Sequence, residues 1–424
     1  MESWYLWPDW ESQRLKSLNE NGSFLLLSVI TYKYAIPMYM RKSFKYRLYP
    51  CKSMKSKLLQ SLEVCRTIYN RTLELKKTSY EQEHKSLSLF DLNKNLTAWS
   101  DNEKTLKSVH SQVLQNCQLR VDLAYKAFFR RCKQGLKPGY PRFKGVGRYD
   151  SMTYKQYGFN LNMTDSTIYL SKIGRVPIIL HRPCLGKIKT CTVLKSRTDK
   201  WFITLSVEMD KPISMPRTGQ VAGLDMGLKT YIVASDGFKV PRKRFFKVDE
   251  HDLARAQRRL EKHAKGSPER NRIKKAITHI HERIADRRND FCHKTALDLV
   301  RRYDFMAVED LSINSMLEEK KYSKNIADAA WAQLLQRLSC KAEEAGKTVV
   351  AVDPRGTSQM CSQCGQIVYK DISVRIHHCP HCGLHIDRDL NASLNILRLG
   401  QQSVEYRSYA TMQDPGRTHK SPRF

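Results

Sequence analysis

Two Cys-x-x-Cys pairs near the C-terminus restrict the local fold more than any other feature of the sequence. Cys361 and Cys364 form the first pair, and Cys379 and Cys382 form the second. A glycine follows each pair, which permits a tight turn around a metal ion. The spacing suits one tetrahedral zinc ion. Because four thiolates leave no open coordination position, we expect a structural zinc and look beside it for the chemistry.

The charge of the chain indicates a polyanionic partner. Its 424 residues include 74 Lys and Arg but only 42 Asp and Glu, which leaves a formal net charge of +32. The excess is spread over much of the chain, as is typical of proteins that bind nucleic acid. A membrane surface would instead require an amphipathic basic helix or a lipid anchor, and we identify neither. A highly charged, solvated surface is the alternative interpretation.

The remaining cysteines and the N-terminus bear on the compartment. Eight further cysteines are scattered without the spacing of a disulfide framework, which predicts a reducing compartment such as the cytoplasm. Residues 24–39 are fairly apolar, but the run is interrupted at Lys33 and is shorter than the ~20 residues of a membrane span. Residues 1–39 differ in composition from the rest of the chain. They are either an extension upstream of a functional start near Met40 or a genuine N-terminal cap.

Hydrophobic spacing predicts a β unit with a helical insertion in the first half. Residues 41–49 alternate like a half-buried strand, and residues 53–131 show the spacing of three or four helices. The Gly- and Pro-rich residues 135–141 end this helical unit. Short strand-like runs then occur at 152–157, 167–170, 176–180, 187–194 and 201–208. Since the helices leave strand 41–49 without a partner, we expect it to join the later strands in a barrel.

The second half predicts a mixed α/β unit with a basic helical hairpin. Asp236-Gly237 is a hairpin turn signal, and residues 266–268 break a helical region. Residues 241–290 contain 16 Lys and Arg against 8 Asp and Glu, so this region is either a solvated hairpin or a pair of helices that grips a nucleic-acid backbone. The expected elements are strands at 221–225, 230–235, 305–311 and 348–354, and helices over 241–300 and 325–345.

Three acidic positions in this second half suggest phosphodiester chemistry. Asp225 and Glu309 end two predicted strands, and Asp387 and Asp389 begin the last helix. Carboxylates at one sheet edge can bind magnesium. Two such ions about 3.5–4 Å apart activate a water and stabilise the leaving oxygen of a phosphodiester. A single strand-end acid is more often a cap, but three acids in the order strand, strand, helix favour an RNase H-like nuclease.

The chain resembles the TnpB (OrfB-type) proteins of bacterial insertion sequences, which are relatives of the compact type V CRISPR nucleases. The resemblance covers about residues 41–398. It rests on the combination of KSFKYRLYP, YPRFKGVGRYDSMTY, VAGLDMGLKTYIVASDG, MAVEDLSINSM, VDPRGTSQMCSQCG and CPHCGLHIDRDLNASLNIL.

This resemblance implies an RNA-guided DNA endonuclease that cuts beside a short DNA motif by two-metal hydrolysis. It implies a guide RNA and double-stranded target DNA as partners, and action in the bacterial cytoplasm at the nucleoid. Asp225, Glu309 and Asp389 would hold two magnesium ions, with manganese as a substitute, and the zinc knuckle would contact target nucleic acid. We prefer Asp389 to Asp387 because it lies in a D-x-N-A element, where Asn391 can support it.

The implied fold is a multidomain α+β chain. It comprises an RNase H-like (RuvC) nuclease domain with a zinc-ribbon insertion, and a β-barrel wedge domain interrupted by a helical recognition domain. The expected parts are an N-terminal extension (1–39), the wedge (40–50 and 135–217), the recognition domain (51–134), the nuclease (218–356 and 384–400), the zinc ribbon (357–383) and a flexible tail (401–424).

Three other functions remain open. The chain could be a DNA strand transferase, a non-catalytic RNA-guided repressor, or a plain zinc-ribbon DNA-binding protein. The letters His279-Ile280-His281 match a HuH nuclease motif, but they lie in a charged helical run. We expect the helical aromatic residues Tyr69, Tyr125, Phe128 and Phe129 to be core residues. The sequence assigns no residue to nucleic-acid contact and indicates no oligomeric state.

Overall fold

A computed structural model describes residues 39–210, 214–318, 322–371, 373–403 and 405–406. Residues 1–38 of the expected N-terminal extension and residues 407–424 of the expected tail lie outside this described part. All described residues belong to the compact unit that begins at Tyr39. None of the helices within the described ranges combines the length and apolar character needed to cross a bilayer.

The first half of the described chain forms a curved, seven-stranded antiparallel sheet. Its order is β2-β6-β7-β1-β5-β4-β3. The strand predicted at 41–49 pairs with β7 along its whole length and with β5 at its end, which confirms that it joins the later strands. The strands are β1 (Tyr39–Leu48), β2 (Ser151–Tyr154), β3 (Phe159–Asn162), β4 (Thr167–Leu170), β5 (Gly174–Ile179), β6 (Lys187–Lys195) and β7 (Trp201–Asp210).

This sheet is nearly closed, whereas we expected a barrel. Its edge strands β2 and β3 do not pair within the described residues. The Tyr154 hydroxyl at the end of β2 instead donates to the Ser171 carbonyl, 3.1 Å away, just beyond β4. On β1, alternate residues Phe44, Tyr46 and Leu48 are buried in the core of the sheet. The period-two pattern in the sequence arises from this one-sided burial.

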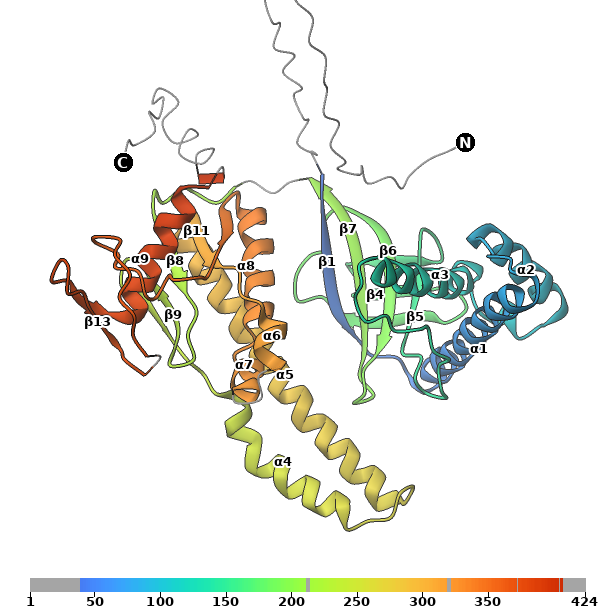
Figure 1. Cartoon of the computed structure of the whole chain (residues 1–424). Helices are drawn as coiled ribbons and strands as arrows, with labels where there is room; N and C mark the ends of the chain where they lie inside the picture. The colour runs from blue at the N-terminus through green and yellow to red at the C-terminus, as the bar shows by residue number, and fades with distance from the viewer. Residues whose placement is uncertain (1–38, 211–213, 319–321, 372, 404, 407–424) are drawn as a thin grey trace, which may run out of the picture. The chain divides into compact units, whose positions relative to one another are not determined.

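Helices α1 (Lys52–Glu83), α2 (Leu89–Asn102) and α3 (Ser111–Lys133), with the short 3-10 turn η1 (Leu106–Ser108), separate β1 from β2. Figure 1 shows them together beside the curved sheet. Their core contains Tyr69 and Tyr125, as predicted. The prediction is wrong for Phe129, whose side chain is 56% exposed. Helical spacing indicates the inner face of α3, because Phe129 follows the buried Tyr125 by one turn, and this spacing gives no sign of its exposure.

The second half contains a five-stranded sheet of order β10-β9-β8-β11-β12. Strands β8, β11 and β12 are parallel, and β9 and β10 run antiparallel in a hairpin. Gly237 in the turn has a φ of +88°, as the Asp-Gly signal predicts. The strands are β8 (Val221–Asp225), β9 (Thr230–Ala234), β10 (Lys239–Pro241), β11 (Phe305–Glu309) and β12 (Thr348–Val352).

Helices cover both faces of this sheet (Figure 1). On β11, Met306 and Val308 pack with α5 (Pro268–Arg302) and α8 (Trp331–Ala345) on one face. Phe305 and Ala307 pack with α9 (Arg388–Gln401) on the other. Every residue of β11 is therefore buried, which explains its unbroken apolar run.

The helix predicted over 325–345 is divided in two. Helix α7 (Ser323–Ala329) ends where Ala330 takes a left-handed conformation, with a φ of +54°, and α8 begins directly afterwards. A short helix, α6 (Ile313–Glu318), precedes α7 and was not predicted. Alanine carries no sequence signal for a left-handed residue, so periodicity alone predicts one continuous helix.

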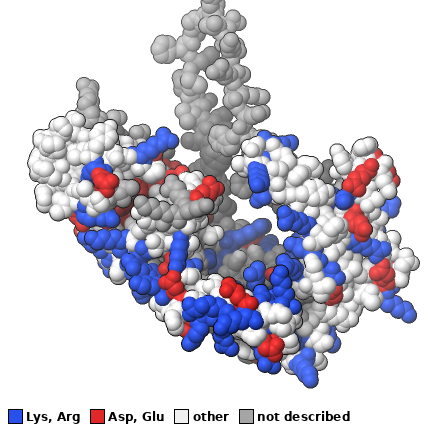
Figure 2. Space-filling view, turned by 60° about the horizontal axis from the view of Figure 1, so that its bottom comes forward, with Lys and Arg blue, Asp and Glu red and all other residues white. Residues whose placement is uncertain are grey.

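The basic hairpin consists of α4 (Phe245–Glu261) and α5, separated at Gly266 as predicted. Of the 16 Lys and Arg in residues 241–290, 13 are exposed. Figure 2 shows Lys and Arg outnumbering Asp and Glu on the side of the molecule toward which this hairpin points. His279 and His281 are exposed on α5, which is a regular helix there.

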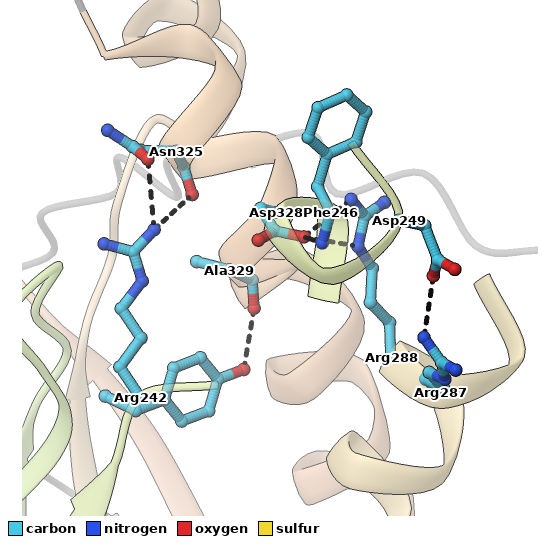
Figure 3. A network of polar contacts seen from close by, with 9 residues as sticks. Arg242, Phe246, Asp249, Arg287, Arg288, Asn325, Asp328 and Ala329 are labelled. Atoms are coloured by element: carbon cyan, nitrogen blue, oxygen red, sulfur yellow. Dashed lines mark hydrogen bonds and ion pairs between the residues drawn. The ribbon is translucent and has the colours of Figure 1, made fainter. Parts of the chain in front are cut away.

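Two buried carboxylates hold the base of this hairpin (Figure 3). Asp249 on α4 forms ion pairs with Arg283 and Arg287 of α5, at 2.8 and 2.7 Å. Asp328 on α7 pairs with Arg288, also at 2.8 Å, and accepts a bond from a backbone N–H of α4. The hairpin is thus fixed to the sheet unit at its base while its basic surface remains in solvent.

The last described elements form a small module against the main sheet. Strands β13 (Ile376–His378) and β14 (His385–Asp387) pair antiparallel, and α9 follows β14 directly. The two Cys-x-x-Cys pairs lie before and within this hairpin. We did not predict the two strands, because three-residue strands carry too short a pattern to recognise.

Candidate active site and metal centre

Strand alternation directs Asp225 and Glu309 to the same side of the second sheet. Ala307 on β11 packs with α9, so Glu309, two residues further, faces the same way. Parallel pairing of Val308 with Leu224 then sets the two acids beside each other at the carboxyl edge. The prediction that each acid ends a strand is confirmed, and the structure shows that the two strands are neighbours.

Helix α9 brings the third acidic position close to this edge. A Cβ at Gly223 on β8 would collide with the Ser393 carbonyl oxygen and the Leu397 nitrogen of α9, so only glycine allows this approach. Ala307 is similarly close to Gly400, near the other end of the helix. These two glycines let α9 lie directly on the strands that carry the acids.

Burial and neighbouring carboxylates both affect the ionisation of Asp225. Burial raises the pKa of Asp225 well above its usual range, and the nearby carboxylates of Glu309, Asp389 and Asp387 raise it further, while Arg388 opposes them. Like charges at close range disfavour ionisation. A cation bound among these acids would remove that repulsion.

Glu309 is almost fully buried and accepts a hydrogen bond from the hydroxyl of Thr357. The Thr357 Oγ1 donates to Glu309 Oε1 at 2.6 Å, and the glutamate is only 8% exposed. Burial raises the pKa of Glu309, and the bond from Thr357 opposes this shift. The Thr357 carbonyl in turn accepts from Asn395 on α9, at 2.9 Å. Thr357 therefore connects the second acid to the helix that carries the third.

The two acids of the Asp-Arg-Asp run have different local partners. Asp387 accepts the backbone N–H groups of Asp389 and Leu390, at 2.9 and 3.2 Å, and is the N-cap of α9. Asp389, in the first turn, has Arg375 at 3.8 Å. Asp387 therefore caps the helix. The side chain of Asp389 is not used in this cap and can bind a metal ion.

Asn391 does not play the role that we expected. Its amide nitrogen donates to the Met360 carbonyl at 2.7 Å, and its oxygen accepts the Ser362 N–H at 2.9 Å. These bonds hold the first cysteine loop instead of supporting Asp389. Asn391 is completely buried, so the exchange of two bonds satisfies both sides of its amide.

Carboxylates are the ligand type that hard divalent cations prefer, although the ligand atoms of these acids are widely spaced. Among the described residues, the four cysteines are the group of metal-ligating side chains whose ligand atoms all lie within 4.8 Å of one another. The sheet-edge acids do not form so tight a group. Ligands shared between two ions about 4 Å apart are themselves more widely spaced. A set made only of carboxylates fits magnesium or manganese.

The four cysteines lie close enough together to hold one metal ion. Thiolates at about 2.3 Å from a tetrahedral ion lie about 3.8 Å from one another. The Sγ atoms of Cys361 and Cys382 are 3.6 Å apart, and so are those of Cys364 and Cys379. The prediction that these four residues form one cluster is confirmed, and their thiol chemistry fits zinc.

The two cysteine loops have matching backbone conformations. The N–H groups of Gly365 and Gly383 donate to the carbonyls of Cys361 and Cys379, both at 2.9 Å. The glycines have φ values of +78° and +73°, which confirms the predicted turns.

Backbone N–H groups around Cys379 favour its thiolate form. Burial raises the pKa of its thiol, but bonds from the backbone N–H groups of Cys382 and His381 outweigh this and lower the pKa to about 6. A thiolate is the form that binds metal.

Sequence reasoning missed Thr357, Arg375 and the capping role of Asp387. An Asp directly before an apolar helix is an N-cap signal, so Asp387 could have been identified. Thr357 and Arg375 lie in loops without periodicity, and only the folded chain brings them to Glu309 and Asp389.

Three family models match the chain. The model described as "Probable transposase" (OrfB_IS605) matches residues 204–320, and "Cas12f1-like, TNB domain" matches 331–396. A "Helix-turn-helix domain" model of the OrfB_IS605 group matches 38–85. Within the described part of this range, the structure has β1 and the single long helix α1.

Two relatives match over most of their length. A protein of Streptomyces pristinaespiralis, provisionally named an RNA-guided DNA endonuclease, is 31% identical over 85% of this chain and 90% of its own. InsQ of Escherichia coli K12, whose name provisionally gives the same activity, is 28% identical over 85% of this chain and 92% of its own length. A solved Cas12f1–sgRNA–target DNA complex superposes with a TM-score of 0.57 and 13% identity, over 84% of this chain and 98% of that one. The last match shows a shared mixed α+β fold.

Proposed function

Because the chain belongs to the TnpB (OrfB-type) family of insertion-sequence proteins, we propose that it is an RNA-guided DNA endonuclease that cuts beside a short DNA motif. The observation that carries this proposal is the meeting of Asp225 and Glu309 with the start of α9 at one sheet edge. A protein that only bound DNA would gain nothing from carboxylates that repel one another and the phosphates.

We assign the second half of the chain to a RuvC-like nuclease with a zinc ribbon. The order β10-β9-β8-β11-β12, with the acids at the ends of β8 and β11, supports the first assignment. The cysteine cluster, inserted between β12 and α9, supports the second. The expected domain boundaries stay a prediction, with the nuclease at 218–356 and 384–400 and the ribbon at 357–383.

Asp225, Glu309 and Asp389 would hold two magnesium ions, for which manganese can substitute. Such ions, when bound, activate water and stabilise charge on the phosphate oxygens. The chain's own residues prepare the site. Thr357 orients Glu309 by its hydrogen bond. Asp387 caps α9 and thereby fixes the backbone on which Asp389 stands.

A guide RNA and double-stranded target DNA are the proposed partners. In this arrangement base pairing reads the sequence, while the protein grips the duplex through its shape and charge. The net charge of +32 and the exposed Lys and Arg of α4 and α5 (Figure 2) support a long polyanionic partner. The protein would act in the bacterial cytoplasm, at the nucleoid.

The first test is to express the protein from its natural locus, with flanking sequence, and to sequence the RNA that co-purifies. We expect one abundant RNA that ends in sequence beyond the element. The loaded complex should then cut a plasmid that carries the matching target and a library of neighbouring motifs, in magnesium but not in EDTA. A smear of host transcripts, with unguided cutting, would contradict the proposal.

The same experiment distinguishes guided cleavage from the three alternative functions. Joined DNA ends would indicate a strand transferase, and guided binding without cutting would indicate a repressor. Binding that ignores the RNA would indicate a plain zinc-ribbon DNA-binding protein. Each result would replace guided cleavage as the function.

A further inference from the structure

Four aromatic rings form an exposed cluster where α3 ends. Phe129 stacks at an offset on Tyr125, with ring centres 6.3 Å apart, and packs edge-on against Phe128 at 5.3 Å. Tyr140 contacts Tyr125 and Phe128 edge-on, and its hydroxyl is 3.0 Å from that of Tyr125. We name these four residues the aromatic platform. Phe129 and Tyr140 are 56% and 49% exposed. Their rings face solvent and rest on those of Tyr125 and Phe128.

The platform lies in a segment without acidic residues. Residues 123–148 contain eight Lys and Arg and no Asp or Glu. All eight are exposed, and within the described chain only Lys126 forms an ion pair. The Arg131 guanidinium reaches to 3.9 Å from the place of a Cβ on Gly139, next to Tyr140. Large exposed rings and unpaired cations therefore occupy the same short stretch.

A basic hollow continues from this segment. It has a volume of about 900 Å³, and its cationic lining is Arg142, Lys144, Arg148, Lys195 and Arg197. Glu63 and Asp150 also line it, but Glu63 is paired with Arg66. Such a hollow suits a phosphate backbone, and the rings suit bases, which is the combination found in single-strand binding sites.

We propose that the aromatic platform stacks an unpaired base of the guide RNA, with Phe129 as the contacting ring. The choice of RNA rests on the proposed function, because a guide stays bound while target DNA arrives only for cutting. An exposed apolar cluster favours aggregation unless a lasting partner covers it. Its cationic surroundings match a nucleic acid and repel a basic second copy of this chain.

The test measures binding of a short, unstructured, single-stranded RNA that contains 2-aminopurine to the full chain. We expect Phe129→Ala to bind about 10-fold more weakly, as for one lost base–aromatic stack, and to lose quenching of the 2-aminopurine fluorescence. Phe129→Trp should restore both. Leu123→Ala, which removes another exposed apolar side chain from α3, should bind like the wild type.

The salt dependence separates stacking from charge. Phe129→Ala should leave the slope of log K against log salt unchanged, whereas Arg131→Gln should reduce it by about 0.7. Equal losses in Phe129→Ala and Leu123→Ala would overturn the proposal. So would a Phe129 effect on single-stranded DNA of the same sequence but not on RNA. Plasmid cutting is scored separately, so an inactive nuclease with an intact Phe129 effect would refute only the proposed function.

Discussion

Among single residues, Asp387 and Asp389 are two positions apart but have opposite surroundings. Asp387 accepts hydrogen bonds from two backbone N–H groups at the start of α9, whereas Asp389 lies 3.8 Å from the Arg375 guanidinium. A carboxylate that caps a helix stabilises the fold, and one that faces other acids can bind a cation.

This difference predicts opposite phenotypes. Asp389→Ala should reduce DNA cutting at least about 100-fold, as loss of a metal ligand would, with little change in stability. Asp387→Ala should destabilise the protein by about 1 kcal/mol, as loss of a cap does, and Asp387→Ser should restore most of this. Plasmid cutting and thermal unfolding measure the two effects. Full activity in Asp389→Ala would show that the wrong acid was chosen.

Asp225→Ala provides the reference for the site. It should abolish cutting while the variant still binds the guide RNA, because Asp225 lies at the sheet edge and not in the basic segments. Gel shift and plasmid cutting on one preparation measure both. Retained cutting by homogeneous protein would remove Asp225 from the active site.

Thr357 should act as a positioning residue. Thr357→Ala removes the donor to Glu309, and we expect cutting to fall about 10-fold, the size of one lost hydrogen bond to a charged group. Thr357→Ser keeps the hydroxyl and should stay close to the wild type. The rate of plasmid cutting under saturating magnesium compares them, and equal rates in the two variants would rule out this role.

At the scale of elements, α9 connects the cysteine loops to the sheet. Asn391 and Asn395 both donate to the Met360 carbonyl, one residue before the first cysteine, while Gly223 lets the helix lie on β8. Loss of the metal should therefore disturb the helix that carries Asp389 as well as the ribbon.

Metal analysis tests this coupling. We expect one zinc per chain in the wild type and in Cys340→Ser, which removes an exposed cysteine outside the cluster. Cys361→Ser should lose zinc, unfold at a lower temperature and cut poorly. Elemental analysis with thermal unfolding checks this, and full zinc content in Cys361→Ser would contradict the ligand set.

At the scale of the whole molecule, a buried ion pair connects the starts of β11 and β12. Its carboxylate also binds the segment that leads into β8. Asp304 and Lys347, just before β11 and β12, pair with each other, and both side chains are 2% exposed. Asp304 also accepts the N–H groups of Thr218 and Gly219, at 2.8 and 2.7 Å. Burial raises the pKa of Asp304, but Lys347 and these N–H groups together lower it below its usual value.

Asp304→Asn should destabilise the protein by about 3–5 kcal/mol at neutral pH, because Lys347 is left buried without its partner. A carboxyl whose pKa is depressed in the folded state stabilises the fold above its unfolded pKa of about 3.9, and this contribution is lost as the pH falls through the lower folded pKa. The gap between wild type and variant should therefore narrow in acid. Unfolding curves across pH measure it, with Asp298→Asn, in the exposed pair with Arg302, as the near-neutral control.

The sequence alone determined the local order of this protein. Strand alternation, helical spacing and turn glycines act over a few residues, so β1, β8, β11, the α4–α5 turn and the cysteine loops were all predictable. The pairing of β1 with the later strands was predictable because the helices that follow β1 leave it without a neighbouring strand in sequence. The left-handed Ala330 and the strands β13 and β14 were not predictable, because alanine carries no signal for a left-handed residue and three-residue strands show too short a pattern.

Only the tertiary structure decided which side chains do what within those elements. Both acids of the Asp-Arg-Asp run fit the same pattern, but the backbone of α9 captures Asp387. Asn391 serves the cysteine loop because that loop folds onto it, and Phe129 is 56% exposed although it lies one helical turn after the buried Tyr125. Hydrogen bonds and burial depend on groups far apart in sequence, and those partners exist only once the chain has folded.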